Sequence, residues 1–412
     1  MSCASCGDKR TVPMSCVMVT KEPSLCHVVT KEPSLCHVVT KEPSLCHAKE
    51  PSLCHVLSVK EESNMKKTIA VIFGGCSTEY GISLKSAYSV ISHIDRIKYE
   101  PVLFGITSSG EWFYFTGEPE KIRDDIWHNP ADCVRAIISP CRRTHGVWIF
   151  DDNKPKAMRI DAAMPILHGK NGEDGTIQGL LELAGIPIIG CGAMSSALCM
   201  DKDRAHKIAE AAGVNAARSF TIRNANSKAD ILEQAEKLGY PLFVKPVKNG
   251  SSYGITKVMN KCDLYAAVKL AFEYDDEVIV EENIDGFEVG CAILGNDHLI
   301  VGDVDEISLT DGFLDYQEKY TPMTSKTLCP AGITVKQAGE IKETAKTIYR
   351  ALGCAGFARV DMFLTPSGKI FFSEVNTIPG FTSHSRYPNM LKSIGMTFGQ
   401  IVNSAIGLAV CE

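Results

Sequence analysis

The sequence lacks the features that mark membrane proteins, secreted proteins and proteins that attract nucleic acid through a positive field. No apolar run approaches the roughly 18 to 20 residues of a transmembrane helix, and the N-terminus lacks the charged-then-apolar layout of a secretory signal. Positive charge is not in excess, because 43 Lys and Arg face 49 Asp and Glu, a net charge of −6. We therefore expect a cytoplasmic protein that binds neither nucleic acid nor membrane. The 412 residues, 45% of them hydrophobic, suit a globular protein of about two or three domains.

Residues 1–64 carry a short repeat that looks unlike the rest of the chain. VTKEPSLCHV at 19–28 recurs at 29–38, again at 39–47, and in shortened form up to residue 56. A ten-residue unit that contains proline cannot sustain a helix and is shorter than the roughly 20-residue minimum of solenoid repeats. We predict a disordered, non-native leader, with the natural chain starting at Met65.

Cysteine is plentiful but does not predict disulfides. Seven of the 17 cysteines lie in residues 1–64 and the other ten are scattered, where we expect small buried side chains. In the leader, the Cys–His pairs together with Cys3 and Cys6 could ligate zinc. Adjacent Cys and His lack the loop spacing of a structural zinc site, so zinc remains the weaker alternative.

Residues 65–190 have the pattern of an open parallel α/β domain. A β-branched run at 68–73 ends in two glycines and leads into a predicted helix, and an apolar strand at 162–167 ends in the polar, glycine-rich stretch 168–176. A helix at 177–184 and a strand at 186–189 follow. Because open α/β sheets bind ligands at the carboxyl ends of their strands, we expect a ligand near both glycine-rich stretches.

Residues 191–284 are predicted to form a second domain. It has helices at 203–212 and 227–238 and strands at 219–222, 241–247 and 256–258, with a Gly/Ser loop at 248–254 just after Lys245. Such a loop can close over phosphates through its N–H groups and hydroxyls, but it is also a common turn. A Walker A loop is excluded, because that motif needs Gly-Lys-Ser/Thr leading into a helix.

Residues 285–412 are predicted to form a third domain that carries a metal site. Apolar, strand-like runs lie at 356–364 and 369–375, and residues i and i+2 of a strand face the same way. Glu374 and Asn376 therefore share a face, and a hairpin through 365–368 can set Asp361 opposite them. Two carboxylates and an amide oxygen suit Mg²⁺, which completes its shell with water and phosphates. The alternative for these three residues alone is a polar edge hairpin.

Two further segments point to a nucleotide site. The strand at 278–284 could meet an adenine amino group through its backbone and a carboxylate, or could be an ordinary edge strand with a charged end. The long irregular segment up to residue 334 is typical of an active-site lid.

Taken together, residues 65–412 resemble an ATP-grasp enzyme, and specifically the D-alanine–D-alanine ligase family. Seven motifs in the family order carry the resemblance: Phe73–Glu79, His168–Gly175, Met200–Lys202, Lys245–Pro246 with Gly250–Ser252, Glu318–Tyr320, Arg359–Asp361, and Glu374–Asn376 with Pro379–Ser385.

The resemblance implies an N-terminal α/β domain followed by two ATP-grasp domains with antiparallel sheets. It implies an enzyme that phosphorylates the carboxylate of D-alanine with ATP and lets the amine of a second D-amino acid attack the acyl phosphate. The product is a dipeptide for peptidoglycan precursors. The implied cofactor is two Mg²⁺, which Mn²⁺ can replace, and the implied assembly is a homodimer.

The resemblance also assigns roles to residues. Mg²⁺ is held by Asp361, Glu374 and Asn376, and phosphates are contacted by Lys202, Lys245 and Lys319, because phosphoryl transfer needs charge neutralisation. The remaining ATP-binding set is Ser251, Ser252, Glu281, Glu282, Ile284 and Glu288, together with Asn376.

Further residues match the substrate-binding and catalytic positions of the family. Arg359 and the Gly380 N–H match the donors to the tetrahedral oxyanion. Glu79 matches the partner of the first ammonium, with a helix N-terminal charge as the alternative. His168 matches a residue near the first substrate, although a lone His at a strand end is often structural. The remaining members are Ser385, Arg386, and the hydrogen-bonded trio of Glu79, Ser251 and Tyr320.

Two departures bear on the substrates. The first loop runs Glu79–Tyr–Gly–Ile–Ser83 where the family commonly has Glu-His-Glu-Val-Ser, and Arg386 follows Ser385 where many housekeeping ligases carry an apolar residue. The Ser–Arg–Tyr–Pro ending resembles the vancomycin-resistance branch.

The second substrate is predicted from the lid and from Arg386. The retained Lys319–Tyr320 favours an amine over D-lactate, and Arg386 or Asp305 could bind the hydroxyl of D-serine. We favour a D-alanine–D-serine ligase, with a D-alanine–D-alanine ligase as the alternative. A surface Arg386 paired with a lid carboxylate such as Glu318 is the competing interpretation.

Two other classes of function fit the residues less well. A non-catalytic nucleotide-binding relative should have lost the Mg²⁺ acids or the oxyanion arginine, yet all are present. An ATP-grasp ligase that acts on a larger substrate fits the Mg²⁺ residues but not the trio of Glu79, Ser251 and Tyr320.

Overall fold

The computed structural model describes residues 66–151, 154–223, 227–250, 253–309 and 325–410. Residues 66–412 form one compact unit. The predicted leader lies outside the described residues, as do four predicted site residues: Ser251, Ser252, Lys319 and Tyr320.

The first sheet is mixed rather than purely parallel, although the strand predicted at 68–73 is confirmed as its β1. Its strand order is β6-β5-β4-β3-β2-β1-β7. β1 (Lys67–Gly74) pairs in parallel with β2 (Tyr99–Ile106) and β7 (Ala162–Ile166). The other strands add antiparallel neighbours: β3 (Trp112–Phe115), β4 (Cys133–Ile138), β5 (Gly146–Asp151) and β6 (Lys154–Arg159). The predicted strand at 186–189 is reduced to a single bridge between Ala163 and Ile188.

Helices at the edge of this sheet begin where the glycine-rich stretches end. Six buried residues finish β1, and Gly74 and Gly75 then take φ of +90° and +98°, which few side chains tolerate. α1 (Tyr80–Ile91) starts at Glu79, and α3 (Thr176–Ala184) starts after Gly175. A short α2 (Glu120–Arg123) lies between β3 and β4.

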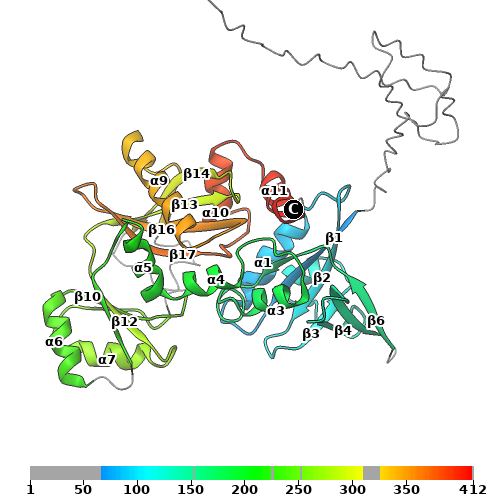
Figure 1. Ribbon diagram of the computed structural model, residues 1–412, viewed down its shortest axis with the longest axis horizontal. Helices are drawn as coiled ribbons and strands as arrows, with labels where there is room; N and C mark the ends of the chain where they lie inside the picture. The colour runs from blue at the N-terminus through cyan, green and yellow to red at the C-terminus, as the bar shows by residue number, and fades with distance from the viewer. Residues whose placement is uncertain (1–65, 152–153, 224–226, 251–252, 310–324, 411–412) are drawn as a thin grey trace, which may run out of the picture. The chain divides into compact units, whose positions relative to one another are not determined.

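The second sheet is antiparallel, with the order β11-β10-β12-β9. Its strands are β9 (Ser219–Ile222), β10 (Leu242–Pro246), β11 (Thr256–Val258) and β12 (Val278–Glu282). α6 (Lys228–Leu238) and α7 (Lys261–Ala271) cover one face (Figure 1) and bury apolar residues such as Val244, Val258 and Val280. The opposite face carries Lys245 and Glu281, the polar residues predicted to meet ATP.

The third sheet has the order β15-β14-β13-β16-β17-β8. It is antiparallel except for the parallel pair of β17 and β8. Its strands are β8 (Asn215–Ala216), β13 (Phe287–Leu294), β14 (Ile300–Leu309), β15 (Ser325–Leu328), β16 (Phe357–Leu364) and β17 (Ile370–Asn376). α9 (Val335–Ala351), which starts with a capping box at Thr334, packs on β13, β14 and β16.

Packing crosses the predicted domain boundaries at 190/191 and 284/285, which stay predictions. α4 (Ala193–Met200) and α5 (Lys202–Ala211) share a core with the third sheet, and β8 pairs with β17 within that sheet. α10 (Arg386–Ser393) and α11 (Phe398–Val410) share a core with β1, β7 and α1. α5 therefore lies between the second and third sheets, contacting β9 and β17.

Among the described helices, none alone is long and apolar enough to cross a membrane; α10 and α11 meet the length and composition only as a pair bent by 103°.

Candidate active site

A row of side chains crosses four strands of the third sheet. In the strand register Asp305 of β14 lies opposite Gly290 of β13, Gly290 lies opposite Asp361 of β16, and Asp361 lies opposite Glu374 of β17. Directly paired residues project from the same face of a sheet, so the three carboxylates share a face. The predicted pairing of Asp361 with Glu374 is confirmed.

Asp361 is the centre of this row. It is buried, with 2% of its surface exposed. Arg359, two residues earlier on β16, donates from Nε to Oδ1 at 2.8 Å and from Nη2 to Oδ2 at 2.6 Å. The Asn376 amide donates to Oδ2 at 2.9 Å. Burial alone would lower the pKa of Arg359, but the neighbouring Asp361 carboxylate raises it overall.

Arg386 fills the space that Gly290 leaves open. Its guanidinium donates to both oxygens of Asp305 at 2.8 Å and from Nη1 to Glu288 at 2.7 Å, and its Nη2 lies 3.5 Å from Asp361 Oδ1. Its side chain is only 16% exposed, so it is not the surface arginine of the competing interpretation. Whether it also reaches a substrate hydroxyl stays a prediction.

The oxygen atoms on this face of the third sheet suit Mg²⁺, which takes part of its ligands from phosphates and water. They suit less well a metal ion whose ligands all come from the protein. Across the described residues, no three Asp, Glu, His or Cys side chains come together as a metal site. The predicted set has two carboxylates and one amide, as expected for an ion that draws its other ligands from phosphates and water. Lys202 Nζ lies 3.5 Å from Glu374 Oε2, so cationic groups already surround the acids.

Two lysines predicted to contact phosphates come from α5 and β10. Lys202, the first residue of α5, is 6% exposed and donates from Nζ to the Asn249 carbonyl at 2.8 Å. Lys245 on β10 donates from Nζ to Glu281 Oε2 at 2.6 Å. Burial would raise the pKa of Glu281, but the positive charge of Lys245 lowers it overall. Lys202 thus joins the start of the Gly/Ser loop to the acid row.

The other predicted ATP-binding residues are only partly brought together. Glu282 binds Arg218 at 2.7 Å, Ile284 is half-buried just after β12, and Glu288 is bound to Arg386 on the third sheet. Glu281 has a neighbour that the sequence did not suggest. His206 of α5 binds the Ser373 carbonyl at 2.9 Å and holds its Nδ1 4.0 Å from Glu281 Oε1.

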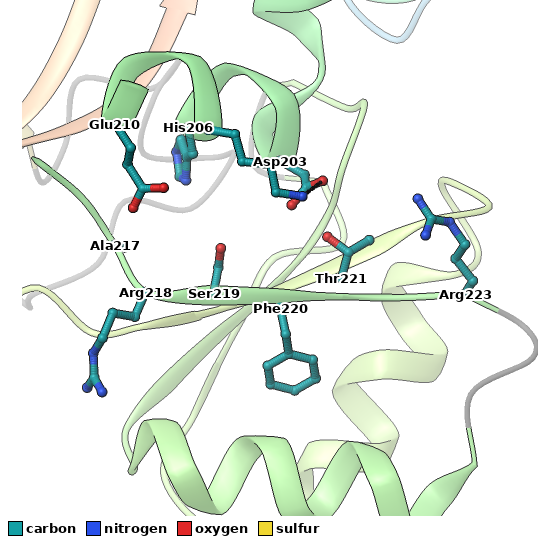
Figure 2. Close-up of a pocket in the computed structure, with 10 residues that line it drawn as sticks. Asp203, His206, Glu210, Ala217, Arg218, Ser219, Phe220, Thr221 and Arg223 are labelled. Atoms are coloured by element: carbon teal, nitrogen blue, oxygen red, sulfur yellow. Dashed lines mark hydrogen bonds and ion pairs between the residues drawn. The ribbon is translucent and has the colours of Figure 1, made fainter. Parts of the chain in front are cut away.

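Two cavities flank this region, and neither is lined by the predicted Mg²⁺ residues. One, of about 480 Å³, lies between α5 and β9. Figure 2 shows Asp203, His206 and Glu210 of α5 facing Ser219 and Thr221 of β9. The other, of about 540 Å³, lies between α4, the loop after β7 and the start of the Gly/Ser loop.

His168 and the segment that follows β17 meet through a relay of hydrogen bonds. The His168 Nδ1–H donates to the Ile378 carbonyl at 2.9 Å, and its Nε2 lies 3.3 Å from Ser86 Oγ. The Phe381 N–H donates to the same Ser86 oxygen at 3.2 Å. Burial lowers the pKa of His168, although the Glu79 carboxylate opposes this shift. These hydrogen bonds hold Ile378 and Phe381, which lie on either side of Gly380. The Gly380 N–H is the predicted oxyanion donor.

Glu79 and Ser385 also lie near the loop after β7 and the segment that follows β17. A Cβ built on Gly169 would lie 2.8 Å from Glu79 Oε2, and one built on Gly250 would lie 3.8 Å from it. Ser385 precedes α10 and bonds the Thr382 hydroxyl at 2.8 Å, and its Oγ would lie 3.0 Å from a Cβ on Gly380. Glu79 therefore lies beside both the loop after β7 and the start of the Gly/Ser loop.

Glu173 is a functional candidate to which the sequence alone assigned no role. Its two oxygens accept the Gly169 N–H at 2.9 Å and the Ile378 N–H at 3.1 Å. Burial, with the Glu79 carboxylate nearby, raises its pKa to about 8. Its place in the motif after His168 was visible in the sequence, but its link to Ile378 depends on tertiary packing.

Comparison with known proteins adds independent findings. The chain matches the family models for the D-ala D-ala ligase N-terminus over residues 68–191 and the D-ala D-ala ligase C-terminus over residues 208–407. It is 43% identical to the vancomycin B-type resistance protein VanB of Enterococcus faecalis over 350 residues, which cover 84% of this chain and 99% of that protein. It is 41% identical to a D-alanine–D-alanine ligase of Caldicellulosiruptor bescii, over 84% of this chain and 95% of that protein.

Solved structures of ligases have the same fold as this chain. The VanG D-Ala:D-Ser ligase from Enterococcus faecalis superposes with a TM-score of 0.79 at 55% identity, covering 84% of this chain and all of that one (100%). The D-alanine–D-alanine ligase from Coxiella burnetii gives 0.72 at 30% identity, covering 84% and 94%.

Proposed function

Since the chain belongs to the D-alanine–D-alanine ligase family, whose members use ATP, we propose that it joins D-alanine to D-serine through a D-alanyl phosphate, for peptidoglycan precursor synthesis. The observation that carries the chemistry is the acid row of Asp361 and Glu374, with Asn376 beside it and Lys202 against Glu374. The proposal includes a cytoplasmic location and a homodimer.

In the first step the carboxylate of D-alanine attacks the γ-phosphorus of ATP. The bond from that phosphorus to the bridging oxygen breaks, and ADP leaves. Lys202 and Lys245 supply positive charge for the phosphates, which matters because such transfers are accelerated mainly by positioning and charge neutralisation. Glu79, beside Gly169 and Gly250, receives the ammonium of D-alanine.

Asp361, Glu374 and Asn376 would hold Mg²⁺, which when bound neutralises the charge that develops on the phosphate oxygens. Arg359 is hydrogen-bonded to both oxygens of Asp361 and so holds this acid in place.

In the second step the amine of the second D-amino acid attacks the carbonyl carbon of D-alanyl phosphate. Negative charge develops on the carbonyl oxygen, and Arg359 with the Gly380 N–H would donate to it. The attacking nitrogen gives up one proton, the C–O bond to phosphate breaks, and phosphate leaves with the oxygen that was the D-alanine carboxylate oxygen.

D-serine as the second substrate is supported by the likeness to the VanG D-Ala:D-Ser ligase at 55% identity. The alternative, D-alanine, is supported by the ligase of Caldicellulosiruptor bescii at 41% identity. Both are amines, so both fit the chemistry above, and they differ by one hydroxyl. A site built to bind a hydroxyl discriminates strongly against substrates that lack it.

The test is ATP-dependent phosphate release with D-alanine plus D-serine, D-alanine or D-lactate, with each product identified by mass. We expect the highest kcat/KM with D-serine. A higher value with D-alanine would assign the alternative, and no release with any of the three would refute the proposed activity. Glu374→Gln should abolish release and keep the fold, while Glu343→Gln on the exposed face of α9 should leave both unchanged.

A further inference from the structure

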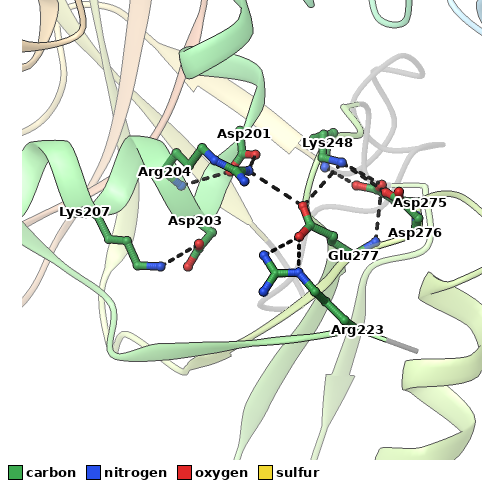
Figure 3. Close-up of polar contacts among 9 residues, drawn as sticks. All are labelled: Asp201, Asp203, Arg204, Lys207, Arg223, Lys248, Asp275, Asp276 and Glu277. Atoms are coloured by element: carbon green, nitrogen blue, oxygen red, sulfur yellow. Dashed lines mark hydrogen bonds and ion pairs between the residues drawn. The ribbon is translucent and has the colours of Figure 1, made fainter. Parts of the chain in front are cut away.

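The Gly/Ser loop begins inside a dense ion-pair network that the mechanism above does not use. Figure 3 shows this network, which we call the loop anchor. Its members come from the start of α5, the end of β9, the residue that opens the loop, and the turn before β12: Asp201, Arg204, Arg223, Lys248, Asp275, Asp276 and Glu277.

Lys248 is held by both its backbone and its side chain. Its N–H donates to Asp275 Oδ2 at 2.6 Å. Its Nζ lies 3.0 Å from Asp276 Oδ1, 3.5 Å from Asp275 Oδ1 and 3.4 Å from Glu277 Oε2. Two separate contacts to one turn fix the direction in which the chain leaves β10, which a single surface ion pair would not do.

Glu277 extends the anchor to the helix that carries Lys202. It accepts from Arg223 at 2.5 Å and lies 3.7 Å from Arg204. Arg204 also binds Asp201, the residue whose side chain caps the N-terminus of α5. The anchor therefore ties the first turn of α5 to the turn before β12.

The backbone of the loop is bonded to the same turn of α5. The Lys202 N–H donates to the Val247 carbonyl at 3.3 Å, and Lys202 Nζ donates to the Asn249 carbonyl at 2.8 Å. Lys248 lies between these two carbonyls in the sequence. A shift of Lys248 must therefore move a carbonyl that holds Lys202 Nζ.

The anchor combines buried acids with exposed cations and one exposed acid, Asp276, which is 78% exposed. The acids Asp275 and Glu277 are 7% and 12% exposed, whereas Lys248 is 39% exposed. Hydrogen bonding to Asp275, together with the charge of Lys248, lowers the pKa of Asp276 to about 2. Exposed pairs contribute little on their own, but buried acids that lose their cation are costly.

We propose that Lys248 is a positioning residue for ATP. Through the loop anchor it fixes the start of the Gly/Ser loop and the position of Lys202 Nζ. This inference rests on the proposed function, because it takes the loop and Lys202 to meet the phosphates of ATP. Lys248 need not touch ATP itself.

The experiment compares the wild-type protein with Lys248→Met, Lys248→Arg and Asp275→Asn. The dissociation constant of ATP is measured by calorimetry with Mg²⁺, and KM for ATP and for D-alanine are measured by phosphate release. We expect Lys248→Met to weaken ATP binding about tenfold, with KM for D-alanine changed less than twofold. Lys248→Arg should recover most of the loss, since it restores the charge. Asp275→Asn keeps an oxygen for the Lys248 N–H and should weaken ATP binding by a smaller factor.

Lys207→Met is the matched control, since Lys207 is also on α5 and pairs with a buried acid, Asp203, at 2.7 Å, and its ion pair involves no described residue of the Gly/Ser loop. It should leave ATP binding unchanged. An unchanged ATP dissociation constant in Lys248→Met, or an equal loss in Lys207→Met, would overturn the inference. If Lys248→Met does not fold, Asp275→Asn decides by the same measure. A wild-type protein that binds ATP but releases no phosphate would refute the proposed function, while the binding ratios would still decide the role of Lys248.

Discussion

At the scale of single residues, the arrangement of Asp361, Glu374 and Asn376 was predictable and its surroundings were not. Asp361, Glu374 and Asn376 follow from strand parity and a short hairpin, and the register confirms that arrangement. The place of Arg386 above Gly290 depends on the pairing of β13 with β14 and with β16, and on α10, and β16 and α10 are far from β13 in the sequence. No local pattern indicates that a glycine on β13 makes room for an arginine on α10.

Gly290→Ala tests this arrangement. A Cβ there would lie 2.5 Å from Arg386 Nη2 and 2.6 Å from Asp305 Oδ1, and Arg386 cannot yield freely because carboxylates hold it. We expect a loss of about 1–3 kcal/mol in the free energy of unfolding, measured by urea denaturation, and a lower turnover. Gly339→Ala in α9, where a Cβ meets nothing within 4 Å, is the control and should be neutral or stabilising. Equal effects at the two sites would show that Arg386 does not depend on Gly290.

Arg359→Ala tests the second chemical step. As one of two predicted oxyanion donors, and as the partner of Asp361, its loss should lower kcat by about 10²–10³. Arg350→Ala, in the last turn of α9, should keep normal turnover. Near-normal kcat in Arg359→Ala would place the oxyanion site elsewhere.

At the scale of elements, the structure shows how loops from distant parts of the chain are joined. The loop after β7 was expected to bind ligand because it follows a strand of an α/β sheet. Its attachment to Ile378 through His168 and Glu173 was beyond prediction, since both bonds span more than 200 residues, with separations of 210 and 205.

The raised pKa of Glu173 predicts how the free energy of unfolding depends on pH. Its pKa is raised from 4.5 to about 8, so between these values the folded protein retains a proton that the unfolded chain has lost. The free energy of unfolding should therefore fall as pH rises through this window. Glu173→Gln removes that titration and one acceptor, at a cost of about 1 kcal/mol. Denaturation curves from pH 5 to 8 should show a shallower decline for the variant, and an identical slope would contradict the assigned pKa.

At the scale of the whole molecule, the fold class was predictable from the order of the motifs. The boundaries of the strands that lie near motifs were predictable as well. The antiparallel strands β3 to β6 were missed, because they lie between motifs and carry no glycine-rich signal. The shared cores were also missed: α11 packs with α1, and α5 packs with the third sheet. Such packing depends on surfaces that pair only after the chain has folded.

A chain that begins at Met65 tests whether residues 1–64 contribute to the enzyme. The matches to relatives cover 84% of this chain but 99% of VanB and 100% of VanG, so the family fold is accounted for without the repeat. We expect the shortened chain to keep its melting temperature within about 2 °C, which corresponds to roughly 1.5 kcal/mol or less for a chain of this size, and to keep kcat. A large loss in either would show that the repeat supports the enzyme.

The central claim is that the reaction passes through D-alanyl phosphate, and oxygen transfer tests it most directly. D-alanine labelled with ¹⁸O in its carboxylate is turned over with ATP and D-serine, and the released phosphate is analysed by mass spectrometry. The mechanism moves one carboxylate oxygen to phosphorus, so each phosphate should carry one ¹⁸O atom and the dipeptide carbonyl should keep the other. Unlabelled phosphate released with dipeptide would contradict the account.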